Sequence, residues 1–128
     1  MNTRDGREVV LQLISAYQEE TRLYEEVYEA AAKQQRVLRN GRDPARVAQL
    51  VERQRRLSED IGKIESGIAP LRDYWEQARD TFHGGHVRNL SRSLDSLLEG
   101  LADRIHAIVE LEREATRELL GTLSEGRP

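Results

Sequence analysis

The chain has 128 residues, of which 34% are charged, only 5% are aromatic and three are proline. This composition is typical of amphipathic helices with narrow apolar faces, and we expect an all-α fold in a single domain, residues 1–128. The absence of cysteine excludes a disulfide framework, and a net charge of −3 gives no overall attraction to nucleic acid or anionic lipid. The apolar run VVLQLI is too short to span a membrane, so we expect a soluble, cytoplasmic protein without membrane insertion.

The first predicted helix covers about residues 5–39. Its apolar residues recur at three- and four-residue steps and so share one face: Val10, Leu13, Ile14, Tyr17, Tyr24, Val27, Tyr28, Ala31 and Leu38. In the stretch RVLRNGRDPARVAQL, Asn40 and Gly41 suit the left-handed conformation that closes a helix. Asp43 suits a helix cap and Pro44 a first helical turn. Because this connection is short, the flanking helices are predicted to form an antiparallel hairpin.

The second predicted helix covers about residues 43–82 and keeps a coiled-coil-like spacing throughout. Its apolar seam, with one glutamine, consists of Val47, Leu50, Gln54, Leu57, Ile61, Ile64, Ile68, Leu71, Trp75, Ala78 and Phe82. Gly67 and Pro70 fall inside the seam without shifting it, which favours a kink near residues 66–70, with a break into two helices as the alternative. The paired glycines of HGGH, residues 83–86, predict the second turn.

The third predicted helix covers about residues 88–120, followed by a frayed tail, 121–128. Apolar pairs at 97 and 98 and at 108 and 109 make its stripe wider than the seam of a two-helix contact. Both edges could be buried, against the other helices or in a homo-oligomer. Alternatively, the surplus could receive an amphipathic helix of another protein. The spacing does not separate these two interpretations.

An arginine-rich run lies between residues 36 and 56. Folding the hairpin brings Arg53, Arg55 and Arg56 opposite acidic residues at 25, 26 and 29, so flanking ion pairs between the helices are the favoured interpretation. Binding of nucleic acid is disfavoured, because no aromatic residues alternate with the arginines and no nucleic-acid motif accompanies them.

Neither a metal site nor an active site is expected. Asp80, His83 and His86 could in principle hold zinc, but the glycines between the histidines make a poorly ordered site, and solvated loop histidines are favoured. The many carboxylates are expected on solvated faces, where nothing raises their pKa, and no phosphate loop or nucleophile motif is present. We therefore predict no cofactor, no metal and no enzymatic activity.

The helical segments resemble those of a known family. The first helix, EETRLYEEVYEAAAKQQRVL, and the start of the second, LVERQRRLSEDIGKIES, resemble the opening of the FlgN-type flagellar export chaperones. The matching positions are Gln34, Gln35, Leu38, Arg53, Gln54, Leu57, Ile61, Ile64 and Glu65. The segment SLLEGLADRIHAIVELEREATRELLGTL is similar to the C-terminal part of that family, except that Glu112, Ala115 and Thr116 replace the asparagines usual before the final double leucine.

The resemblance implies a cytoplasmic chaperone that uses no nucleotide or metal. Such a chaperone binds the amphipathic terminal helices of hook-filament junction proteins and keeps them soluble before flagellar type III secretion. On this hypothesis the client surface is the stripe of the third helix: Leu97, Leu98, Leu101, Ile105, Ile108, Val109 and Leu111, with Leu119 extending it. The alternative is a structural coiled-coil or adaptor protein that self-associates and has no client.

Overall fold

The computed structural model describes residues 6–41, 43–82 and 84–125, with side chains up to residue 121. It contains three long α-helices and confirms the all-α prediction: α1, Gly6–Asn40; α2, Pro44–Ala78; and α3, Gly85–Glu125. A short 3-10 helix, η1, covers Arg79–Thr81.

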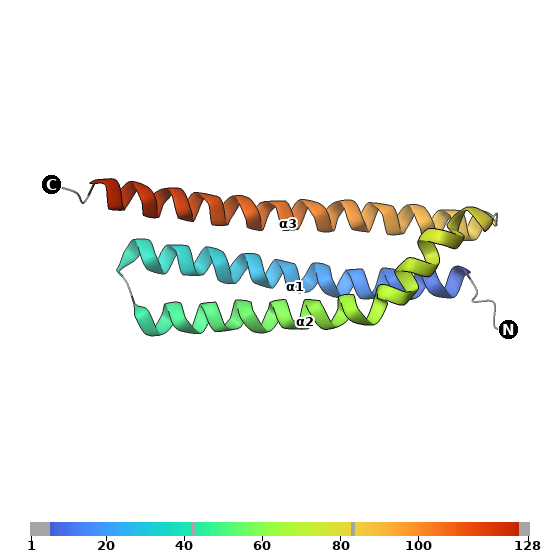
Figure 1. Cartoon of the computed structure of the whole chain (residues 1–128), viewed down its shortest axis with the longest axis horizontal. Coiled ribbons are helices and arrows are strands. Elements are labelled where there is room, and N and C mark those ends of the chain that lie inside the picture. The colour runs from blue at the N-terminus through green and yellow to red at the C-terminus, as the bar shows by residue number, and fades with distance from the viewer. Residues whose placement is uncertain (1–5, 42, 83, 126–128) are drawn as a thin grey trace.

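The first helix, α1, lies between the other two (Figure 1). α2 runs antiparallel to α1, and α3 runs parallel to α1, so that α1 and α3 begin at the same end of the molecule. α1 contacts both other helices along its length, whereas α2 and α3 make little direct contact with each other. The arrangement is therefore a bundle organised around its first helix.

The hairpin turn forms as the local sequence predicts. Gly41 has a φ of 145°, a conformation that favours glycine. The side chain of Asp43 accepts a hydrogen bond of 3.1 Å from the backbone N–H of Arg46, and Pro44 occupies the first turn of α2. A cap on one side and a glycine on the other close one helix and start the next within three residues.

α2 is one continuous helix through Gly67 and Pro70, and it bends toward α3 in its last third (Figure 1). It ends at Ala78 rather than at residue 82, and η1 follows. The ring of Phe82 then stacks on the ring of Trp75, with centroids 5.8 Å apart and an interplanar angle of 14°. This stacking explains the early end, because Phe82 leaves the helical path with an extended backbone in order to reach Trp75.

α3 is longer than the sequence predicts at both ends. It begins at Gly85 instead of residue 88, and the backbone N–H of Arg88 donates to the carbonyl of Gly84 over 3.1 Å. It continues through Gly121 to Glu125, so residues 121–125 are not the predicted frayed tail. One glycine costs a helix only about 1 kcal/mol, which a long helix tolerates. Residues 126–128 lie outside the described part of the chain.

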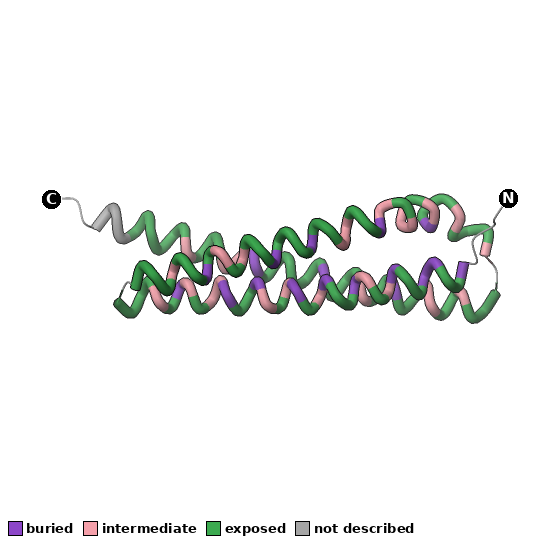
Figure 2. Tube along the Cα trace, turned by 90° about the horizontal axis from the view of Figure 1, so that it is seen from below, coloured by how far each residue is buried: buried purple, intermediate pink, exposed green. Residues whose placement is uncertain are grey.

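Two clusters of buried side chains hold the bundle together. The closed-end core lies toward the α2–α3 turn and contains Val9, Val10, Leu13, Tyr17, Ile68, Trp75, Leu94 and Leu101. The open-end core lies toward the hairpin turn and contains Leu23, Val27, Leu57, Ile61 and Ile108. Figure 2 shows the buried positions along the faces where the helices meet, and the described residues of α3 near its C-terminal end coloured mostly as exposed.

Two residues assigned to the apolar face of the first helix are exposed instead. Tyr28 is 42% exposed and Leu38 is 49% exposed, although Ala30 and Gln35 in the same part of α1 are buried, so the two residues lie on a face that the neighbouring helices do not cover. Glu20, like Gln35, is a polar residue buried at a helical step between apolar positions. Position around the helix therefore decides burial as much as residue type does.

Candidate functional site

The structure divides the predicted client stripe of α3 into two parts. Leu101 and Ile108 are 6% and 7% exposed and belong to the two cores, and Leu97 and Leu111 are half-buried beside them. Leu98, Ile105, Val109 and Leu119 are instead exposed. A partner could reach Leu101 and Ile108 only if α3 left α1, so these two do not belong to the accessible surface of the folded chain.

The exposed residues follow a coiled-coil repeat of their own. Six positions at alternating steps of three and four form what we call the outer seam: Asp95, Leu98, Ala102, Ile105, Val109 and Glu112. Leu98, Ile105 and Val109 are 37–38% exposed, and the other three are exposed as well. Five of the six lie one residue after a buried or half-buried residue of α3: Leu94, Leu97, Leu101, Ile108 and Leu111. The outer seam therefore faces about 100° away from that buried row. Sequence reasoning missed Asp95 and Ala102 as members of the site and assigned Glu112 no role in it.

A groove with both polar and apolar lining, called the mixed groove below, adjoins the outer seam at the hairpin end. It has a volume of about 250 Å³ and is lined from all three helices by Ala31, Gln34, Gln35, Leu38, Gln54, Leu111, Glu112, Ala115 and Thr116. The side chain of Gln54 donates to that of Gln34 over 2.6 Å. Gln35 is only 9% exposed, and its side chain helps that of Arg39 to lower the pKa of Glu118 on α3. The groove therefore places amide side chains of α1 and α2 beside the end of the outer seam.

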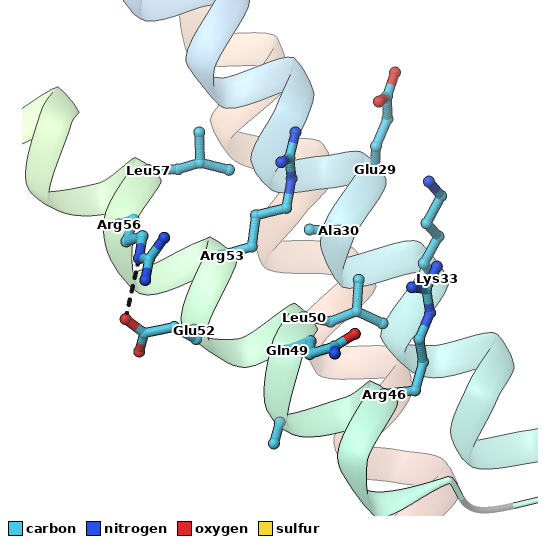
Figure 3. Close-up of a pocket in the computed structure, with 11 residues that line it drawn as sticks. Glu29, Ala30, Lys33, Arg46, Gln49, Leu50, Glu52, Arg53, Arg56 and Leu57 are labelled. Carbon is cyan, nitrogen blue, oxygen red and sulfur yellow. Dashed lines mark hydrogen bonds and ion pairs between the residues drawn. The ribbon is translucent and has the colours of Figure 1, made fainter.

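A second, larger groove lies between α1 and α2 and has a volume of about 830 Å³ (Figure 3). Lys33, Arg46, Arg53 and Arg56 line it together with two glutamates. Arg56 pairs with Glu52 over 3.2 Å. Arg53 pairs with Glu26 of α1, so two of the four basic side chains are already paired.

The predicted ion pairs between the helices of the hairpin form only in part. Arg53 pairs with Glu26 across the hairpin over 2.9 Å. Arg55 and Arg56 instead pair with glutamates of their own helix, and the hydrogen bonds from Arg55 lower the pKa of Glu52 to about 2. Glu25 pairs with Arg104 of α3 over 2.6 Å. Glutamates three or four residues away on the same helix reach Arg55 and Arg56 more readily than glutamates of the neighbouring helix do.

One carboxylate departs from the expectation that all of them are solvated. Glu20 is 1% exposed, and burial raises its pKa to about 8, with a further contribution from its hydrogen bond to Glu65. Arg72 pairs with Glu65 over 2.7 Å and also hydrogen bonds to Tyr17. The network links α1 to α2 beside Pro70, where α2 bends. Glu20 is the buried member of this network, whereas the side chains of Glu65 and Arg72 are 37% and 38% exposed.

Among the described residues, no group of three histidine or acidic side chains could hold a metal ion. The predicted candidate included His83, which lies outside the described part of the chain. None of the described helices combines the length and the apolar character needed to cross a membrane.

Comparisons of the chain with protein-family models, curated proteins and solved structures found no match. The outer seam and the adjoining mixed groove are therefore interpreted from their own chemistry.

Proposed function

We propose that this chain binds an amphipathic helix of a partner protein on the outer seam of α3. The observation that supports this is the row of Leu98, Ala102, Ile105 and Val109, which spans more than three helical turns and in which every residue is exposed in the folded chain. A coiled-coil repeat of apolar residues on a helix already packed through its other face is the pattern that accepts one more helix.

The resemblance to the FlgN-type export chaperones indicates which partner to test. The clients would be the hook-filament junction proteins, whose amphipathic terminal helices would otherwise expose apolar seams and aggregate before secretion. In this role the protein acts in the cytoplasm without cofactor or catalysis, and α1 and α2 hold α3 straight. The closed-end core, which packs Leu94 and Leu101 of α3 against the other helices, serves as the scaffold.

The second candidate is a self-associating coiled-coil protein. It is favoured by the same observation, because a second copy could cover the outer seam in place of a client. The two candidates differ in the mass of the free protein: the client-binding proposal requires a monomer or a dimer that leaves the seam open.

The test is a calorimetric titration of the purified chain with the C-terminal helical segment of a hook-filament junction protein from the same genome. We expect saturable binding, and at least a tenfold loss in the double variant Ile105→Gln, Val109→Gln, because both side chains are exposed and their exchange leaves the cores intact. The matched control is Leu11→Gln, which changes a leucine that is 43% exposed on α1. Equal binding by the double variant and the control would contradict the seam as the site.

A further inference from the structure

The outer seam is bracketed by carboxylates. Asp95 precedes Leu98 by three residues and Glu112 follows Val109 by three, so an acidic residue stands at a seam position on each side of the apolar row. Both are exposed, and neither forms an ion pair with any residue that the structure describes. Unpaired acids at seam positions are unfavourable for a simple apolar contact, and they indicate selection among partners.

The two acids disfavour pairing of the seam with a second copy of itself. A parallel pair in register places Glu112 opposite Glu112. An antiparallel pair that aligns Leu98 with Val109 places Asp95 opposite Glu112 at both ends. A shift by one heptad in one direction places Glu112 opposite Ala102; a shift in the other direction lets Glu112 meet Arg88 but places Asp95 opposite Ile105. Each arrangement therefore opposes two like charges or buries an unpaired carboxylate against an apolar side chain, and both are costly. A different protein is therefore the favoured occupant.

We propose that the outer seam selects a partner helix in which basic residues bracket an apolar row, one facing Asp95 and the other facing Glu112. Beyond the first basic residue, the partner has apolar residues 3, 7, 10 and 14 positions further along the chain and a second basic residue 17 positions further along. Because these intervals read the same from either end, they hold for both orientations of the partner. The inference rests on the proposed helix-binding role but not on the identity of the client.

The seam beyond Glu112 continues with a polar side chain. The next seam position is Thr116, which is exposed, and Glu112 and Thr116 line the mixed groove together with Gln34 and Gln54. An apolar side chain returns at Leu119, which is 60% exposed. A partner that continues past its second basic residue thus meets hydrogen-bonding groups before more apolar surface, and this change fixes the register, as single polar residues do in coiled coils.

The first test uses the chain alone. We expect the wild type to leave the seam unpaired, whereas the double variant Asp95→Leu, Glu112→Leu forms a dimer whose fraction rises with concentration in sedimentation equilibrium. The matched control, Glu99→Leu, Asp103→Leu, removes the same charges and adds the same side chains at exposed positions off the seam. It should behave as the wild type. A helical, folded double variant that associates no more than the control would overturn the proposed role of the acids.

The second test measures charge selection with two designed helical peptides. Both carry leucine at the four apolar positions, and the bracketing residues are lysine in one and glutamate in the other. We expect the wild type to bind the lysine peptide at least tenfold more tightly, and the variant Asp95→Lys, Glu112→Lys to show the reverse preference. Circular dichroism of each variant checks that it is folded.

The outcomes separate this inference from the proposed function. Equal binding of the two peptides, or no binding of either, overturns the inference. Binding of the lysine peptide together with no binding of the junction-protein segment supports the seam and its charge selection while it removes the proposed client. Binding of the junction-protein segment with no preference between the peptides leaves the client proposal standing and removes the role of the acids.

Discussion

The closed-end core gathers eight buried side chains, two of them from α3, whereas the open-end core, next to the hairpin turn, gathers five, of which only Ile108 comes from α3. The closed-end core includes Trp75, which stacks on Phe82 where α2 bends toward α3. At the open end Ile108 is the last residue of α3 that is buried among those with described side chains. Polar groups and exposed ion pairs follow, such as the pair between Arg39 and Glu118.

This difference separates stability from binding. Apolar burial is the main source of folding free energy, and it is greatest where Val10 and Leu13 are almost completely covered. The helix that carries the outer seam extends from this core toward the open end, so a partner can pack on it without competing with α1 or α2. Substitutions at the two ends should therefore have very different effects on stability.

The largest effect is expected for Trp75→Ala at the closed end. Loss of a buried aromatic side chain that is 5% exposed should lower the free energy of unfolding by about 3–5 kcal/mol. The matched substitution at the open end is Leu119→Ala, where the side chain is 60% exposed and the change should stay within about 0.5 kcal/mol. Urea unfolding followed by circular dichroism measures both. Similar losses at the two sites would remove the distinction between the ends.

The next effect concerns Glu20, which lies between the two ends. Its pKa of about 8 in the folded chain exceeds its ordinary value of 4.5. The protonated form is therefore favoured by folding: its contribution to stability is fully present below about pH 4.5 and is lost as the pH rises through about 8. Glu20→Gln should remove this pH dependence and raise the free energy of unfolding at alkaline pH by up to about 4 kcal/mol. Unfolding curves between pH 4 and 9, compared with those of Glu19→Gln on the exposed face, test it. A wild type that is equally stable across this range would show that Glu20 is not buried as described.

The smallest effects are expected at two glycines and should have opposite signs. A Cβ atom at Gly6 would lie 2.8 Å from the ring of Phe82, so Gly6→Ala should displace the ring and destabilise the closed end by about 1–3 kcal/mol. A Cβ atom at Gly62, on α2, meets nothing within 4 Å, so Gly62→Ala should stabilise the chain by about 0.5–1 kcal/mol. Thermal unfolding measures both changes. A shift in the same direction for the two variants would contradict the packing at Gly6.

The sequence predicted the hairpin turn well because the responsible side chains act on their immediate neighbours. Asp43 caps the backbone three residues away, and Gly41 adopts a conformation of its own. The end of α2 was not predictable in this way, because it depends on Phe82 reaching Trp75 by leaving the helical path. The end of α3 was predicted too early, because Gly121 is a weak stop signal without a proline or a cap nearby.

The sequence indicated the third helix as the place of the candidate site but did not separate the buried face of that helix from its exposed face. The width of the apolar stripe indicates that the stripe has two edges. Which edge is buried depends on the helices that pack against it, and the residue spacing of one helix does not identify those helices. A signal was nevertheless present: the positions 95, 98, 102, 105, 109 and 112 form a second complete repeat, offset by one residue from the buried one. Glu20 was missed for a related reason, because its charge was weighed more than its place in the helical spacing between Tyr17 and Leu23.

The most direct test of the open outer seam uses single cysteines, which the natural chain lacks. The rate of reaction with a thiol reagent is measured for Ile105→Cys and for Leu101→Cys, with and without the junction-protein segment. We expect Ile105→Cys to react quickly and to be protected by the segment, and Leu101→Cys to react slowly in both conditions. Slow reaction at position 105 in the free chain, or fast reaction there that no helical partner reduces, would contradict the claim that α3 carries an open seam for a partner helix.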